Sequence, residues 1–136
     1  MKTVLFACVH NAGRSKMAAA FFNQAADPAR ARAISAGTQP ASRAHPEVVV
    51  AMREAGVELG DAKPTLLTVE VARTADLLIT MGCGEACPHV PGLRHVDWEL
   101  ADPKGASSER VREIRDEVRA RVRGLIDENG WARAQP

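Results

Sequence analysis

The residues with the clearest chemical potential in this sequence are a cysteine and an arginine near the N-terminus, in the string Cys8-Val-His-Asn-Ala-Gly-Arg14-Ser15. A thiolate is a strong nucleophile, and a guanidinium can bind two oxygens of a tetrahedral oxyanion through parallel hydrogen bonds. The Ser15 hydroxyl can donate to the Cys8 sulfur or cap a helix. The string therefore predicts a site in which Cys8 attacks a phosphate-like centre held by Arg14.

The segments on either side of this string must hold it in place. Residues 3–8 form a short apolar run typical of a buried strand, and residues 16–26 are Ala-rich and favour a helix that begins near Arg14. A loop between them can point backbone N–H groups at an anion, with the positive end of the helix dipole behind it. That field also favours a thiolate at Cys8. The alternative is a buried structural cysteine beside an unrelated arginine, and the agreement of strand, loop and helix disfavours it.

Composition limits the possible classes of protein. The chain has 136 residues, 46% of them hydrophobic and 26% charged, which predicts one globular domain over residues 1–136. A net charge of +1 gives no reason to expect nucleic acid or a membrane as a partner. The sequence has no apolar run of membrane-spanning length, no signal-peptide pattern and an odd number of cysteines, three in all. We therefore expect a soluble, cytoplasmic protein, and we expect it to be a monomer.

The rest of the chain alternates between strand and helix patterns. The further strands expected are 31–35, 75–81 and 93–98, and the further helices expected are 46–55, 68–74 and 109–128. Thr68 and either Ser107 or Ser108 suit helix N-caps, whereas the residues from Asn129 onward are expected to fray. This order predicts an α/β fold, a four-stranded parallel sheet with helices on both faces. Ligands of such sheets bind beyond the carboxyl ends of the strands, where Cys8 lies.

The spacing Cys-x5-Arg-Ser resembles the phosphate-binding loop of the low-molecular-weight protein tyrosine phosphatases. The fuller string is similar to the arsenate reductases built on the same fold, through Cys8, Asn11, Arg14, Ser15, Met17 and Ala18. The resemblance implies that fold, with no cofactor and no metal. It also implies that the oxyanion is bound by His10, Asn11, Ala12, Gly13, Arg14 and Ser15. Asn11 would hold the shape of the loop by bonding its backbone, and whether the His10 side chain faces the site or the solvent stays open.

Asp102-Pro103 resembles the Asp-Pro pair of the same phosphatases, whose aspartate is the general acid. An aspartic acid near a bound oxyanion can protonate the leaving oxygen. The alternative is a turn aspartate, since Asp-Pro is common in turns. With the Cys8 loop present, the catalytic interpretation of Asp102 is favoured.

Two further cysteines, Cys83 and Cys87, separate the reductase from the phosphatase. Arsenate reduction takes two electrons, which thiols supply by forming a disulfide. The resemblance implies a relay in which Cys83 attacks the Cys8 adduct and Cys87 then takes over the disulfide, for reduction by thioredoxin or a similar thiol. Only three residues separate Cys83 from Cys87, fewer than in the well-known three-cysteine reductases, so the order of the relay and the reductant stay open. Zinc bound by these cysteines with His89 and His95 is the competing interpretation, although the spacing matches no common zinc motif.

The sequence therefore supports three functions, in a stated order. The first is an arsenate reductase whose substrate is arsenate or a phosphate-like oxyanion and whose partner is a thiol reductant. The second is a low-molecular-weight phosphatase that hydrolyses phosphate monoesters through a phosphocysteine and gives Cys83 and Cys87 no role. The third is a non-catalytic anion sensor or zinc-bound module, which the complete setting of Cys8 disfavours.

Overall fold

The computed structural model describes residues 1–59, 63–82 and 90–133. Its elements follow one another as strands and helices in the order β1 (Lys2–Cys8), α1 (Arg14–Ala25), β2 (Ala31–Gly37), α2 (Pro46–Glu54), α3 (Val69–Arg73), β3 (Leu77–Thr80), β4 (Arg94–Asp97) and α4 (Ser108–Asn129). Each of these elements was expected from the sequence, with boundaries that differ by one to three residues. No helix in the described part of the chain is long and apolar enough to cross a membrane.

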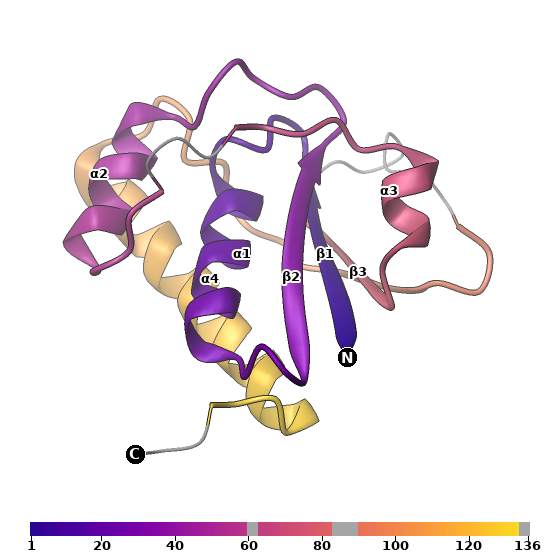
Figure 1. Ribbon diagram of the computed structural model, residues 1–136. Helices are drawn as coiled ribbons and strands as arrows, with labels where there is room; N and C mark the ends of the chain where they lie inside the picture. Colours follow the sequence, from indigo (N-terminus) through magenta and orange to yellow (C-terminus); the bar gives the residue numbers. More distant parts are fainter. Residues whose placement is uncertain (60–62, 83–89, 134–136) are drawn as a thin grey trace.

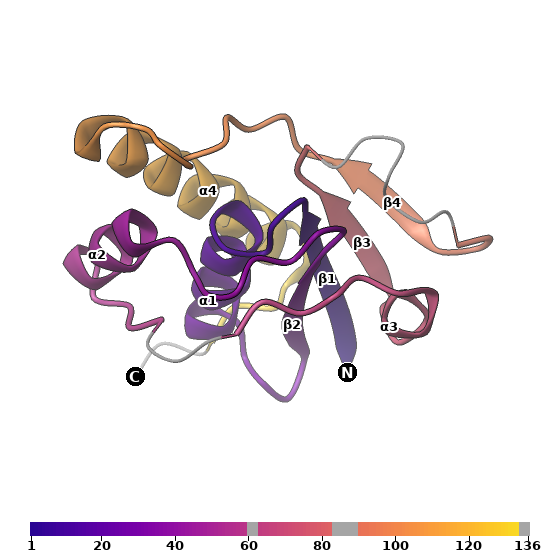
Figure 2. The same ribbon diagram turned by 90° about the horizontal axis from the view of Figure 1, so that it is seen from above.

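The four strands form one parallel sheet in the order β2-β1-β3-β4. Helices α1, α2 and α4 lie on one side of the sheet and α3 lies on the other (Figure 1). Figure 2 looks from above onto the edge where the strands end and shows the same two layers. The predicted four-stranded parallel sheet with helices on both faces is confirmed.

Alternation along β1 divides the core between the two faces. Val4, Phe6 and Cys8 point to the side of α1 and α4, whereas Leu5 and Ala7 pack in a smaller cluster with the α3 side. Successive side chains of a strand point to opposite faces, and all five are buried because helices cover both. Cys8 is therefore the last inward residue of a buried strand, which fixes the direction of its side chain.

The helices begin where the sequence offers a cap. Thr68 accepts a hydrogen bond from the Val71 N–H at 3.1 Å, and Ser107 accepts one from the Arg110 N–H at 3.2 Å. These bonds satisfy N–H groups that the first turn of a helix leaves without partners. Of the two candidate caps of α4, the structure selects Ser107.

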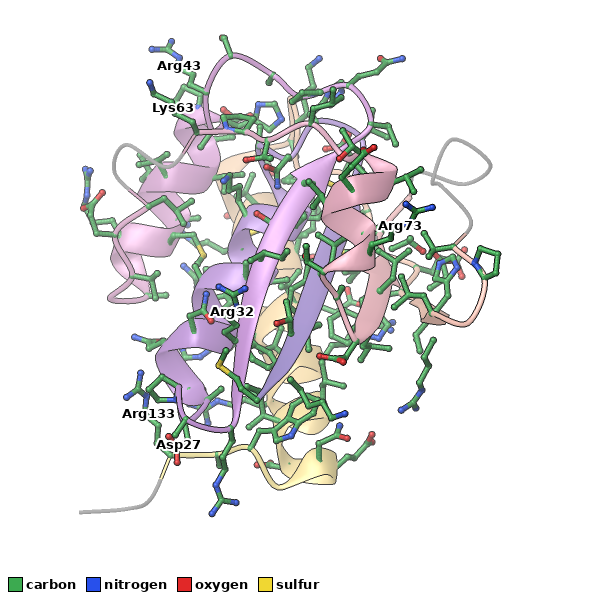
Figure 3. The ribbon with its side chains drawn as sticks, turned by 45° about the vertical axis from the view of Figure 1, so that its right-hand side comes forward. Asp27, Arg32, Arg43, Lys63, Arg73 and Arg133 are labelled. Carbon is green, nitrogen blue, oxygen red and sulfur yellow. The ribbon has the colours of Figure 1, made fainter. Side chains whose placement is uncertain are left out.

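The prediction that the chain frays from Asn129 onward is wrong as far as residue 133. Gly130 ends α4 in the left-handed conformation, with a φ of 69°. The chain then turns back, so that the Trp131 ring lies edge-on to Phe22, with 5.9 Å between ring centroids, and its carbonyl accepts from the Asp27 N–H at 2.7 Å. Arg133 donates to carbonyls at the end of α1, and it is labelled beside Asp27 in Figure 3. Contacts distant in sequence thus hold this segment.

Candidate active site

The Cys8 sulfur lies in a network of short hydrogen bonds at the carboxyl end of β1. Its Sγ is 2.8 Å from Ser15 Oγ and accepts the backbone N–H of Asn11 at 3.3 Å. The Ser15 oxygen already accepts the Asn11 side-chain amide at 2.8 Å, so its own proton is directed toward the sulfur. Two donors aimed at one sulfur favour the thiolate, because a hydrogen bond to the charged form stabilises that form.

Asn11 is the central fastener of this loop. It is fully buried and has a φ of 49°, a left-handed conformation that asparagine tolerates better than most side chains. Its amide nitrogen donates to Ser15, and its Oδ1 accepts from the Thr65 N–H at 2.8 Å. The expectation that Asn11 bonds the backbone of its own loop needs correction, since its side chain joins Ser15 to the segment before α3.

Arg14 is the first residue of α1, and its guanidinium is held from three sides. One nitrogen donates to the Leu100 carbonyl at 3.0 Å, and the other lies 3.6 Å from an Asp102 oxygen. A Cβ added at Gly82 would lie 2.5 Å from the first of these nitrogens, so only glycine leaves room for the guanidinium there. The arginine is thus buried, fixed in direction and adjacent to the predicted acid.

Asp102 combines the two roles that the sequence left as alternatives. Its side chain is 43% exposed and lies beside Arg14, while its other oxygen accepts from the Lys104 N–H at 3.0 Å. The second bond is a turn contact of the kind that aspartates make two residues ahead. The turn therefore positions the carboxyl group at the site without removing it from solvent.

The start of α1 supplies further donors. Gly13 stands at the N-cap and has no side chain to cap the helix, so the first N–H groups of α1 are available to an anion. A Cβ at Gly13 would meet Pro103 at 2.9 Å and His45 at 3.5 Å. The loop therefore packs closely against both the Asp102 turn and the start of α2.

Lys16 adds a positive charge on the first turn of α1. Burial lowers the pKa of this lysine, and the negative charge of Cys8 opposes that shift. Its ammonium group donates to the Lys63 carbonyl at 2.8 Å. Lys63 and Arg43 are both labelled at the upper edge of Figure 3, above the carboxyl ends of the strands. The described charges around this edge are suited to attract an anion.

The two histidines near the loop lie together. The His10 ring is 6.1 Å from the His45 ring, edge to face, and His10 Nδ1 lies 3.3 Å from the Gln39 carbonyl. His45 is the N-cap residue of α2, as expected from its place before Pro46. Because a carbonyl oxygen accepts only, His10 Nδ1 carries the proton and Nε2 is left for other partners.

Two of the predicted catalytic residues, Cys83 and Cys87, lie outside the described residues. The zinc alternative is untested for the same reason, since His89 also falls there. Its fourth proposed ligand, His95, has its Nε2 2.8 Å from Thr80 Oγ1. Among the described residues, no group of three or more histidine, cysteine or acidic side chains is placed to hold a metal ion.

Three contributors to this site were missed in the sequence. Gly82 makes room for Arg14, the Leu100 carbonyl receives it, and Gly37 leaves space for the loop, because a Cβ there would lie 2.5 Å from the Val9 carbonyl. A backbone carbonyl gives no sequence signal. The two glycines gave one, since each directly follows or ends an apolar strand, where a missing side chain often marks a close approach.

A buried thiol at the end of a strand, the N-terminus of a helix and an arginine beside an aspartate together define a site for attack on a tetrahedral oxyanion. The family model described as low molecular weight phosphotyrosine protein phosphatase matches residues 3–133, and the chain belongs to this family.

Its relatives include proteins named arsenate reductases. An arsenate reductase of Brevibacillus brevis is 32% identical, with 93% of this chain and 95% of the relative covered. A glutaredoxin arsenate reductase of Synechocystis is 33% identical, with 93% and 97% covered. The structure of the thioredoxin-dependent arsenate reductase Cg_ArsC1' of Corynebacterium glutamicum has a TM-score of 0.81 and 43% identity over 94% of this chain. The match covers 61% of that structure's chain, so the present chain spans about three fifths of its length.

Proposed function

We propose that this protein reduces arsenate to arsenite through a thiol adduct on Cys8. The observation that carries the proposal is the setting of the Cys8 sulfur, which receives Ser15 and the Asn11 N–H at the foot of a helix that begins with Arg14. Within this family the chemistry begins with a cysteine thiolate, and the relatives named above favour arsenate over a phosphate ester as the centre attacked.

In the first step the Cys8 thiolate attacks arsenic. A sulfur–arsenic bond forms and one arsenic–oxygen bond breaks, and the leaving oxygen departs as water after taking a proton from Asp102. Arg14 and the first N–H groups of α1 hold the three remaining oxygens and neutralise their charge. Because donors and charges are already in place around the sulfur, little reorganisation accompanies the reaction.

In the second step electrons pass from sulfur to arsenic. The thiolate of Cys83 attacks the Cys8 sulfur, a disulfide forms, and arsenite leaves with the electron pair of the broken sulfur–arsenic bond. Arsenic gains two electrons and the two cysteines lose them. Cys87 then attacks Cys83 and frees Cys8, and a dithiol protein such as thioredoxin or glutaredoxin reduces the remaining disulfide.

The names of the relatives support a thiol reductant but differ in which one they print, glutaredoxin in one case and thioredoxin in another. The reaction requires free thiols between turnovers, which suits the cytoplasm, where thiols are kept reduced. A monomer of one domain over residues 1–136 stays a prediction.

Phosphatase activity is the second candidate, because its first step uses the same Cys8, Arg14 and Asp102. It would end when water attacks a phosphocysteine, with no second thiol. The family to which the chain belongs is described by that activity. The two functions therefore share a site and differ in the step that follows the adduct.

A coupled assay separates the two candidates. The protein is mixed with arsenate, thioredoxin, thioredoxin reductase and NADPH, with a parallel series containing glutaredoxin, glutathione and its reductase, and a third with a phosphate monoester. We expect arsenate-dependent NADPH oxidation in at least one thiol series, and phosphate release that is slower. Phosphate release with no arsenite formed in either thiol series would contradict the proposal and favour the phosphatase.

A further inference from the structure

Two imidazoles stand beside the oxyanion loop without a part in the chemistry above. His10 lies two residues after Cys8, and His45 precedes α2, 35 positions later in the sequence. Their ring centroids are 6.1 Å apart at an interplanar angle of 74°. Both residues are partly exposed, so a proton from solvent can reach them.

His45 is attached directly to the loop that would hold the anion. Its backbone N–H donates to the Ala12 carbonyl at 2.9 Å, and its ring lies 3.5 Å from where a Cβ of Gly13 would be. Gly13 is the N-cap of α1, the residue from which the anion-binding N–H groups start. The imidazole is thus about one residue removed from the predicted anion position.

The charges that face His45 come from three parts of the chain. Burial is the main cause of a lowered pKa for His45, below its ordinary value of 6.5, and His10 and Lys104 lower it further. Glu47 on α2 and Asp102 oppose the shift. The free protein therefore holds His45 neutral near pH 7, although a negative charge nearby is able to raise its pKa.

We propose that His45, together with His10, is a specificity-determining wall of the oxyanion site, which binds a doubly charged oxyanion more tightly when the wall is protonated. The proposal rests on the oxyanion site proposed above. The neutral pair admits the anion, and a bound dianion supplies the negative charge that an imidazolium needs. His10 Nε2, unprotonated while Nδ1 faces the Gln39 carbonyl, becomes a donor on protonation.

Coulomb attraction sets the size of the effect. A single positive charge several ångströms from a dianion in a partly solvated site tightens binding by about fivefold. Binding and protonation are reciprocal, so the dianion raises the pKa of His45 by the same factor that protonation raises its affinity. The sign follows directly. The affinity for a dianion rises as pH falls through the pKa of His45, and it is lowest above that range.

Sulfate is the probe that tests this, because it stays doubly charged across the relevant pH range, unlike phosphate. Its dissociation constant is measured by calorimetry from about pH 8 to about pH 5.5, where histidine titrates. The full chain carries Cys8→Ser and Asp102→Asn, which remove the two other titrating groups at the site. His45→Asn is then added, since asparagine is a good N-cap and should preserve α2. His95→Gln on β4 is the matched control.

We expect about fivefold tighter sulfate binding at the acid end in the parent protein and with His95→Gln. His45→Asn should remove most of this dependence, and adding His10→Gln should flatten it. In imidazole NMR spectra, sulfate should raise the midpoint of the His45 titration. Sulfate binding whose pH dependence survives both histidine substitutions would overturn this proposal and leave the proposed function intact. A protein that binds no sulfate at any pH would overturn the oxyanion site itself.

Discussion

The two loops that meet at Arg14 are built in different ways. The loop from Cys8 to Ser15 is buried at six of its eight positions, and its asparagine and serine are bonded to one another. The connection from β4 to α4, residues 98–107, is held by the buried side chains of Trp98, Leu100 and Pro103 and exposes the residues between them. The first loop is a fixed cradle for a nucleophile, and the second presents an acid to solvent.

This difference separates activity from stability. Substitutions in the buried loop should reduce both, because its polar groups are part of the core and an unpaired buried group is costly. Substitutions at the exposed positions of the connection should reduce activity alone, since surface ion pairs contribute at most about 1 kcal/mol to stability.

The largest effect should come from Cys8→Ser. A serine hydroxyl stays protonated near pH 7 and is a poor nucleophile in this setting, so both arsenate reduction and any phosphatase activity should fall below detection. The measurement is the rate of each reaction at saturating substrate. Because serine fits the same space, sulfate should still bind. Appreciable turnover in this variant would contradict the assignment of the site.

Asp102→Asn should have the next largest effect. It keeps the shape of the turn and the contact with Lys104 but removes the proton donor, so the rate of adduct formation should fall by about 10²- to 10⁴-fold. Stability should change by less than about 1 kcal/mol, because the carboxyl group is exposed. Rapid-mixing kinetics and urea unfolding give the two values. An unfolding change as large as the kinetic one would erase the difference between the loops.

Asn11→Ala should cost about 2–4 kcal/mol of stability, because it leaves the Thr65 N–H without its acceptor and breaks the bond to Ser15. Oxyanion binding should weaken as well. Asn23→Ala is the matched control, since Asn23 also bonds a distant backbone, at Ala33, but lies away from the site. The control should lower stability and leave sulfate affinity unchanged. Equal losses of sulfate affinity in the two variants would show that Asn11 acts only through stability.

Gly82→Ala should have the smallest effect, a loss of about tenfold in oxyanion affinity from a displaced Arg14. Gly92→Ala controls for backbone strain, since both glycines have a φ near 90° but only Gly82 meets another residue. Both variants should lose about 1 kcal/mol of stability from that strain. Sulfate titration distinguishes them, and identical affinities would show that Arg14 does not depend on Gly82.

The sequence predicted the parts of this molecule that depend on neighbours in the chain. The strand before Cys8, the caps Thr68 and Ser107 and the loop containing Arg14 follow from local pattern, and each is present. The close contact of Gly82 with Arg14, the place of His45 beside Gly13 and the anchoring of Trp131 on Phe22 were not predicted. Each joins residues far apart in sequence, so no local periodicity reports it.

The central claim is that Cys83 and Cys87 complete the reaction that Cys8 begins. The direct measurement is one equivalent of arsenate added to the reduced protein, followed by alkylation and mass spectrometry of the cysteine pairs, together with the yield of arsenite. We expect one arsenite per protein and a Cys83–Cys87 disulfide in the wild type, a trapped Cys8–Cys83 disulfide with Cys87→Ser, and no arsenite with Cys83→Ser. Normal thioredoxin-driven recycling in both serine variants would contradict the relay and leave the protein a phosphatase or a reductase that depends on a small external thiol.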